Sequence, residues 1–150
     1  MAEKAIDIAS PILSRNERLA DQLRQRFKET NTYVINVLSS PGSGKTTTIL
    51  GTNERLRDKA GLRCAVIEGD IASDVDAITM KEAGMPAIQI NTGGLCHLEG
   101  NMIMEAVDAF DQAVGLENID VIFIENVGNL VCPAEFDTGA VKNAMILSVP

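Results

Sequence analysis

The chain has 150 residues and a mass of 16.1 kDa, about the size of one domain. With 45% hydrophobic and 23% charged residues it lies in the globular range, and no apolar run reaches the roughly 18 residues that span a bilayer. A net charge of −8 and 3% aromatic residues argue against nucleic acid as a partner, because phosphate neutralisation needs a basic face. With no signal pattern at the N-terminus, we expect a cytoplasmic protein that uses neither nucleic acid nor a membrane.

The first predicted element is an amphipathic helix at about residues 14–30. Leu19, Leu23 and Phe27 recur there at a four-residue spacing, with charged residues between them, so one stripe of the helix should be buried. Residues 33–38 form a short, mostly apolar run. Such a run is too short for a helix and is typical of a strand buried on both faces of a parallel sheet.

The same alternation continues along the chain. In order, it predicts a helix at 46–59, a strand at 63–67, a helix at 74–83, a strand at 87–90, a helix at 103–114 and strands at 120–125 and 144–149. Alternating strands and helices predict an α/β fold of three layers, with helices on both faces of a mostly parallel sheet. Ligands of such sheets bind at the carboxyl ends of the strands.

A glycine-rich segment, SSPGSGKT at residues 39–46, follows the first predicted strand directly. It matches the phosphate-binding pattern G-x-x-x-x-G-K-[ST] from Gly44 onward, although Ser39 replaces the first glycine. The glycines let successive N–H groups converge on phosphate oxygens, Lys45 reaches the β- and γ-phosphates, and the Thr46 hydroxyl binds Mg²⁺. A plain glycine-rich turn is disfavoured because strand, loop and helix occur in the required order. The predicted nucleotide-binding residues of this loop are Gly42, Ser43, Gly44, Lys45, Thr46 and Thr47.

Acidic residues end two of the other predicted strands. Asp70 follows the second strand and Glu125 ends the fourth, where both carboxylates can approach Mg²⁺. The segment from Glu125 to Gly128 spaces an acid and a glycine as switch loops do, which places the Gly128 N–H near a γ-phosphate. Asp74 and Asp76 either position water or cap the next helix.

Three cysteines and a single histidine suggest a second site. Cys96 and His97 follow the third strand and Cys132 follows the fourth, so both loops should emerge beside the nucleotide. Two thiolates and an imidazole suit Zn²⁺ or Ni²⁺, although core packing remains the alternative for each cysteine. Cys64 lies within a strand, where packing is favoured.

Several motifs together resemble the HypB family of P-loop GTPases, which assist nickel insertion into [NiFe]-hydrogenase. The resemblance covers nearly the whole chain, and its segments are residues 40–47, 68–70, 89–93, 96–98 and 123–137, the last being FIENVGNLVCPAEFD. It implies GTP and Mg²⁺ as ligands of Lys45, Thr46, Asp70 and Glu125, with Lys45, Asp70 and Glu125 as catalytic residues. It also implies that Cys96, His97 and Cys132 bind nickel or zinc across the interface of a nucleotide-dependent homodimer. The implied partners are another nickel-insertion accessory protein and the hydrogenase large subunit.

Two features depart from that family. Residues 1–63 contain neither cysteine nor histidine, so an N-terminal metal-storing segment is absent from this sequence. The guanine-reading N-K-x-D motif is also absent. We therefore expect residues 1–150 to form a single nucleotide-binding domain that is truncated at its C-terminal end, and this chain does not itself distinguish GTP from ATP.

The preferred hypothesis is a slow, regulatory GTPase that acts as a metallochaperone, in which Gly128 senses the γ-phosphate and hydrolysis moves the nearby Cys132. The alternative is a nickel or zinc binding or storage module that depends on nucleotide without effective hydrolysis. A small ATP-dependent kinase is a third option, but no arginine cluster suggests an acceptor pocket.

Overall fold

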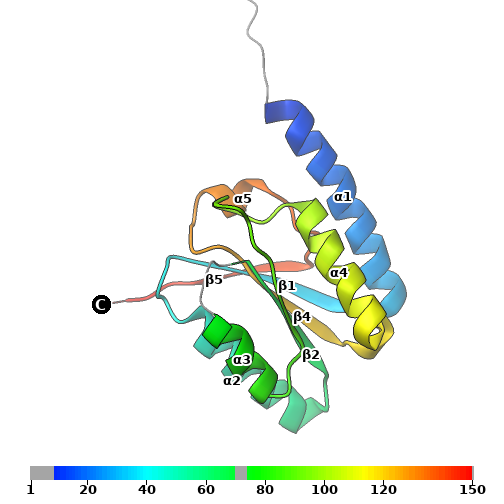
Figure 1. Cartoon of the computed structure of the whole chain (residues 1–150), viewed down its shortest axis with the longest axis vertical. Helices are drawn as coiled ribbons and strands as arrows, with labels where there is room; N and C mark the ends of the chain where they lie inside the picture. The colour runs from blue at the N-terminus through cyan, green and yellow to red at the C-terminus, as the bar shows by residue number, and fades with distance from the viewer. Residues whose placement is uncertain (1–8, 70–73, 150) are drawn as a thin grey trace, which may run out of the picture.

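The computed structural model describes residues 9–69 and 74–149. In these residues, five strands form one sheet in the order β3-β2-β4-β1-β5, and every pairing is parallel (Figure 1). The strands are β1 (Tyr33–Ser39), β2 (Cys64–Glu68), β3 (Ala87–Gln89), β4 (Val121–Glu125) and β5 (Lys142–Ile146). Because all strands run the same way, their carboxyl ends meet at one edge of the sheet, as the sequence pattern predicts.

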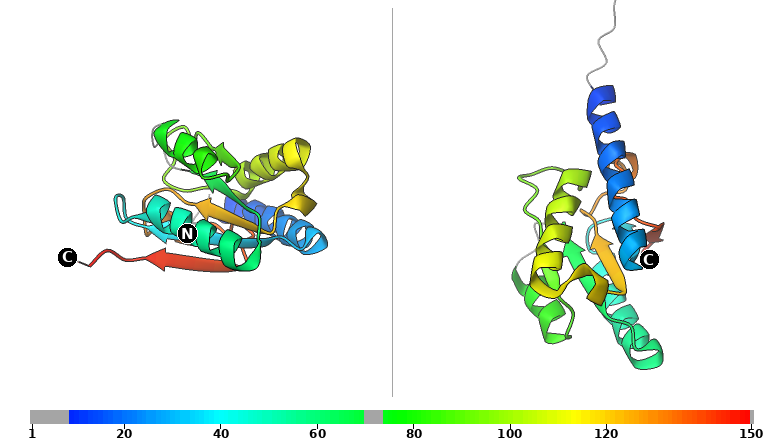
Figure 2. Two further views of the ribbon diagram at one scale, coloured as in Figure 1. Left: turned by 90° about the horizontal axis from the view of Figure 1, so that it is seen from below. Right: turned by 90° about the vertical axis from the view of Figure 1, so that its right-hand side faces the viewer.

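Helices cover both faces of this sheet, which confirms the predicted three-layer α/β fold. The described helices are α1 (Ala9–Thr30), α2 (Lys45–Ala60), α3 (Asp74–Glu82), α4 (Gly100–Val114), the short α5 (Cys132–Glu135) and a 3₁₀ turn at Leu116–Asn118. α1 and α4 lie side by side on one face, and α2 and α3 lie on the other (Figure 2). None of the helices in the described ranges is long and apolar enough to cross a membrane.

The predicted stripe of α1 is the part of this helix that enters the core. Leu23 and Phe27 are almost fully buried and pack with Phe110 of α4 and Ile122 of β4. Burying a side chain of this size contributes about 1.5–3 kcal/mol relative to leaving it in water. The stripe therefore fixes α1 against α4 and the sheet.

The bounds of most elements differ from the sequence prediction by up to five residues, and one short helix was not expected. α1 begins at Ala9 instead of residue 14, because Pro11 occupies the first turn, where a helix does not need its N–H groups. β5 covers Lys142–Ile146 instead of 144–149, because it pairs with β1, and β1 ends at Ser39 opposite Ile146. The short helix α5, with Pro133 in its first turn, was not predicted.

Candidate nucleotide and metal site

The phosphate-loop segment connects the carboxyl end of β1 to the start of α2, as its sequence pattern requires. Gly42 and Gly44 have φ angles of 72° and 93°, which residues other than glycine rarely adopt. Their conformation turns the chain sharply into α2, whose first residue is Lys45. Lys45 is only 5% exposed, so this cation is held in the loop and is not simply solvated. The N-terminus of α2 and Lys45 together favour an anion at this place.

The structure brings the predicted Mg²⁺ ligands Thr46 and Glu125 together. The Thr46 hydroxyl donates a hydrogen bond of 3.0 Å to Glu125 Oε1, which joins the phosphate loop to the end of β4. Glu125 is 5% exposed. A hydroxyl and a carboxylate are oxygen ligands of the kind that Mg²⁺ takes beside phosphates, so the residues present fit this ion.

A third residue of this cluster, Glu68, was not singled out from the sequence. It ends β2 in register with Glu125 on β4 and is 4% exposed. Alternation along the two strands places both carboxylates on the face that carries α2 and α3. The signal in the sequence was an apolar strand that ends on an acidic residue. Two neighbouring buried carboxylates repel each other, which favours a cation beside them.

Two further residues of the phosphate loop, Ser43 and Thr47, differ in burial. The Ser43 hydroxyl oxygen is buried and has no hydrogen-bond partner among the described residues. A buried polar atom without a partner is costly, so the site is suited to a ligand oxygen at this position. Thr47 is exposed in the first turn of α2.

The predicted γ-phosphate sensor, Gly128, packs directly against the phosphate loop. A Cβ atom on Gly128 would lie 3.1 Å from both Cα and Cγ of Pro41, closer than ordinary carbon contacts. A larger residue would require Pro41 to shift by a few tenths of an ångström, so glycine suits this close approach. The segment after β4 and the phosphate loop thus face one another, as the switch hypothesis requires.

The remaining predicted acids are not placed in the site. Asp70 lies outside the described residues. Asp74 and Asp76 lie in the first turn of α3, but their side chains fall outside the described part of the structure. Their roles stay predictions.

The structure brings Cys96 and Cys132 together, from the loops that follow β3 and β4. A hydrogen bond with the Cys132 thiol, helped by burial, raises the pKa of the Cys96 thiol. His97 Nδ1 lies 3.7 Å from Cys96 Sγ. Within the described ranges, however, no group of three His, Cys, Asp or Glu side chains has the spacing to hold a metal ion. The pair with its neighbouring imidazole is therefore an incomplete set of ligands in a single chain.

Cys64 is separate from this pair, as predicted. It lies on β2 in the core beneath α2 and α3 and is 6% exposed. Burial raises the pKa of this thiol to about 11, which keeps it protonated at neutral pH.

One buried amide, Asn126, connects the nucleotide side to the cysteine loops, and sequence reasoning missed it. Asn126 follows Glu125 directly and is fully buried. Its Oδ1 accepts hydrogen bonds from the backbone N–H of Leu98 at 3.3 Å and of Val127 at 2.9 Å. Its Nδ2 donates to Asn36 Oδ1 on β1 at 3.0 Å. A polar residue directly after a buried strand was the only signal in the sequence.

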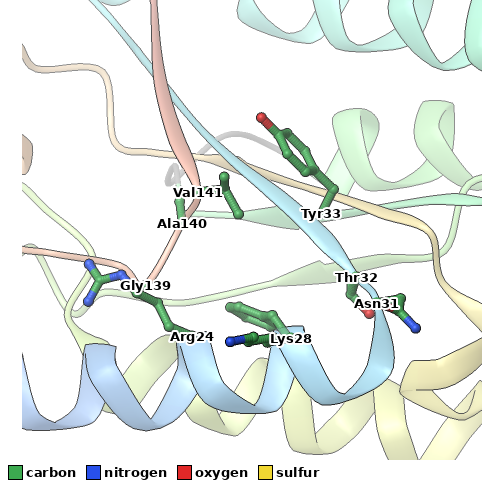
Figure 3. A pocket seen from close by; sticks show the side chains of 9 residues that line it. Arg24, Lys28, Asn31, Thr32, Tyr33, Gly139, Ala140 and Val141 are labelled. Carbon is green, nitrogen blue, oxygen red and sulfur yellow. The ribbon is translucent and has the colours of Figure 1, made fainter.

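A pocket of about 560 Å³ lies at the opposite edge of the sheet, between the end of α1 and the starts of β1 and β5 (Figure 3). Tyr33 and Val141 line one side, and Arg24 and Lys28 reach it from α1. Arg24 is already paired with Asp137. Those predicted ligand-binding residues that the structure describes lie at the other edge, where parallel sheets bind their ligands.

Comparison with known proteins identifies relatives along most of the chain. Residues 33–147 match the family model described as CobW/HypB/UreG, nucleotide-binding domain. A hydrogenase/urease maturation factor HypB of Helicobacter hepaticus is 45% identical over 148 residues, covering 99% of this chain and 60% of that protein. A hydrogenase maturation factor HypB of Escherichia coli K12 is 44% identical over 146 residues, covering 97% of this chain and 48% of that protein. The chain thus spans about half to three fifths of the length of these curated relatives.

Two solved structures share the fold. The crystal structure of HypB from Helicobacter pylori in complex with nickel superposes with a TM-score of 0.78 at 40% identity, covering 87% of this chain and 59% of that one. The hydrogenase maturation factor HypB from Archaeoglobus fulgidus gives 0.78 at 34% identity, covering 89% and 62%. The resemblance predicted from the motifs is confirmed: this chain belongs to the CobW/HypB/UreG family of nucleotide-binding domains, and within that family its relatives are maturation factors of the HypB type.

Proposed function

We propose that the chain is a nucleotide-controlled nickel-binding domain, which binds and slowly hydrolyses GTP and serves hydrogenase maturation in the cytoplasm. The matched relatives are maturation factors, and one of them is solved with nickel. The observation that carries the proposal is the direct connection between the phosphate loop and the cysteine loops. Glu125 contacts Thr46, and the next residue, Asn126, holds the backbone of Leu98 beside His97.

The hydrolysis step follows from the residues of the phosphate loop. Lys45 and the N-terminus of α2 bind the β- and γ-phosphates, and Lys45 stabilises the charge on the phosphoryl group as water attacks it. Thr46 and Glu125, with Glu68 beside them, would hold Mg²⁺, which neutralises phosphate charge when bound. Asp70 stays a predicted member of this group. Since catalysis here is positioning and electrostatics without a dedicated base in the described residues, slow turnover is expected.

Coupling between the two sites has two short routes. Gly128 abuts Pro41 of the phosphate loop, and the same segment continues to Cys132. Asn126 provides the other route, to the loop that carries Cys96 and His97. A nucleotide that shifts the end of β4 therefore moves both candidate metal-binding loops. By linkage, metal must change nucleotide affinity by the same factor.

The metal is held by Cys96, His97 and Cys132 in this proposal, and a second copy of the chain supplies the remaining ligands. Two soft thiolates and an imidazole suit Ni²⁺ or Zn²⁺. Structural sites for such ions are usually four-coordinate, and the described side chains of one chain do not form a complete group of ligands, so a site shared by a homodimer fits this set best. An accessory nickel-insertion protein and the hydrogenase large subunit are the proposed further partners.

Phosphate release with GTP and with ATP tests the enzymatic part. We expect turnover with GTP that is lost in Lys45→Ala and kept in Lys59→Ala, a matched control at the exposed far end of the same helix. Absence of turnover with either nucleotide would support a nucleotide-dependent metal carrier instead. Turnover with ATP that requires an acceptor would support a kinase.

Nickel affinity measured calorimetrically with a non-hydrolysable GTP analogue and with GDP tests the coupling. Allosteric coupling is commonly about 5- to 150-fold in affinity, and equal affinities would refute the proposal. Cys132→Ala should lower the amount of metal bound. Cys64→Ala, a substitution of the core thiol, should leave that amount unchanged.

A further inference from the structure

The single histidine, His97, has a different neighbour at each of its two ring nitrogens. His97 Nε2 and Glu99 Oε1 are 3.1 Å apart, so the ring donates its Nε2–H to a carboxylate. The opposite nitrogen, Nδ1, faces Cys96 Sγ at 3.7 Å. A neutral imidazole that donates from Nε2 carries its lone pair on Nδ1. The two contacts therefore select the nitrogen on the cysteine side.

The distance between Cys96 Sγ and Nδ1 matches one metal ion shared by both atoms. Zn–S and Zn–N bonds of about 2.3 and 2.0 Å at a tetrahedral angle put sulfur and nitrogen roughly 3.5 Å apart. The observed 3.7 Å is close to this value. At a right angle, as between adjacent ligands of a square-planar site, the same bonds would need about 3.0 Å. Both atoms could therefore bind one metal ion with little movement of either side chain.

A second contact fixes the plane of the ring. His97 stacks on Phe136, with ring centroids 3.8 Å apart and planes inclined by 12°. Phe136 comes directly after α5, the short helix that begins with Cys132. The stack therefore ties the His97 ring to the segment that carries the second cysteine, so that both loops contribute to one arrangement.

A third contact anchors the residues that follow Glu99 and Phe136. Asn16 of α1 is 5% exposed. Its Oδ1 accepts from the N–H of Gly100 at 2.6 Å, and its Nδ2 donates to the carbonyl of Asp137 at 2.8 Å. One buried side chain thus holds the backbone directly after both Glu99 and Phe136.

We propose that Glu99 and Phe136 are positioning residues that fix His97 in the Nε2–H form, so that it binds metal through Nδ1 on the same side as Cys96. This inference rests on the proposed metal site. It adds the ligating atom and the residues that select it. Carboxylate partners of metal-bound histidines commonly contribute about 10- to 100-fold in metal affinity.

Because His97 is the only histidine in the chain, ¹⁵N NMR of histidine-labelled protein reports on this ring alone. In metal-free protein we expect a protonated Nε2 and an unprotonated Nδ1, and Zn²⁺ should shift the Nδ1 resonance. An Nδ1–H form, or zinc binding at Nε2, would overturn this inference while leaving the metal site in place. If zinc shifts neither nitrogen, His97 is not a ligand and the metal set of the proposed function is wrong as well.

Variants of Glu99 distinguish a role in positioning His97 from a merely structural role. Glu99→Ala should mix the two neutral forms of the ring and lower zinc affinity roughly 10- to 100-fold. Glu99→Gln keeps an acceptor oxygen and should restore most of both readouts. Glu105→Ala, an exposed substitution on α4, which Glu99 directly precedes, should change neither. If Glu99→Ala leaves both the ring form and the affinity unchanged, the positioning role is refuted.

Discussion

Removing the amide of Asn126 should destabilise the fold more than its small size suggests. Asn126→Ala leaves three hydrogen-bonding groups without their partner, the N–H groups of Leu98 and Val127 and the Oδ1 atom of Asn36. Leu98 and Asn36 are 0% and 2% exposed, so water does not easily replace the lost bonds. Each orphaned buried group costs about 1–3 kcal/mol.

The geometry of the three hydrogen bonds narrows the expected loss of unfolding free energy. The Leu98 bond is long, at 3.3 Å, and Val127 is half-buried, so both contribute at the low end. We expect the free energy of unfolding to fall by about 3–5 kcal/mol, a large part of the roughly 5–15 kcal/mol of a typical domain. With a urea dependence of about 2 kcal/mol per molar, the unfolding midpoint should move down by about 1.5–2.5 M.

Urea titration followed by circular dichroism measures this shift. Asn101→Ala, at an exposed position of α4, is the matched control and should stay within about 0.5 kcal/mol of the parent chain. Asn126→Asp keeps the acceptor for the two N–H groups but loses the donor to Asn36, so its effect should be intermediate unless the new charge dominates. A loss below about 1 kcal/mol for Asn126→Ala would refute the view that this amide connects the loops through buried hydrogen bonds.

Three further predictions concern other parts of the fold. Gly128→Ala should weaken nucleotide binding in a titration with a fluorescent analogue, because the new methyl group meets Pro41 of the phosphate loop at 3.1 Å. The urea midpoint should change little. An unchanged nucleotide affinity would contradict a phosphate site shared by Gly128 and this loop. Iodoacetamide at a mildly alkaline pH should modify Cys64 last by mass spectrometry, because it is buried and its pKa is raised to about 11. The stability that comes from keeping this thiol protonated is present below its ordinary pKa of 9.0 and is lost as pH rises towards 11. Hydrogen bonds from Arg63 lower the pKa of Asp120 below its ordinary value of 3.8. The stabilisation from these bonds is present above pH 3.8 and is lost as the pH falls through the lowered pKa. In a measurement of stability against pH, Asp120→Asn should therefore flatten the fall in stability at acid pH.

The fold could be predicted because its signals are local and periodic. The stripe of Leu23 and Phe27 defines α1, and short apolar runs define buried strands. The glycines of the phosphate loop specify a backbone shape directly, which is why the sequence pattern alone predicts this site. Boundaries set by pairing were not predictable: the end of β5 depends on where β1 ends, and no feature of β5 itself records that.

The residues that sequence reasoning missed act through neighbours distant in the chain. Glu68 becomes a candidate site residue only because the register of β2 and β4 places it beside Glu125. From the sequence, Asn126 is simply a polar loop residue. Its role depends on its hydrogen-bond partners, Asn36 on β1 and Leu98 in the loop between β3 and α4. Asn16 lies on a helix whose apolar stripe suggests packing alone. Such roles depend on contacts that the linear pattern does not contain.

These contacts also link the cysteine loops to the phosphate loop at the edge of the sheet where the strands end. β4 is central, and its last residue contacts Thr46 while the next residue holds the loop of His97. On the far side, α1 clamps the same two loops through Asn16, which bonds Gly100 and Asp137. The loops are therefore held between a rigid helix and a strand end that the nucleotide site contacts. In the proposed function, a displacement at that strand end is therefore passed to the cysteine loops, because α1 is fixed by its buried residues Leu23 and Phe27 and does not readily move with it.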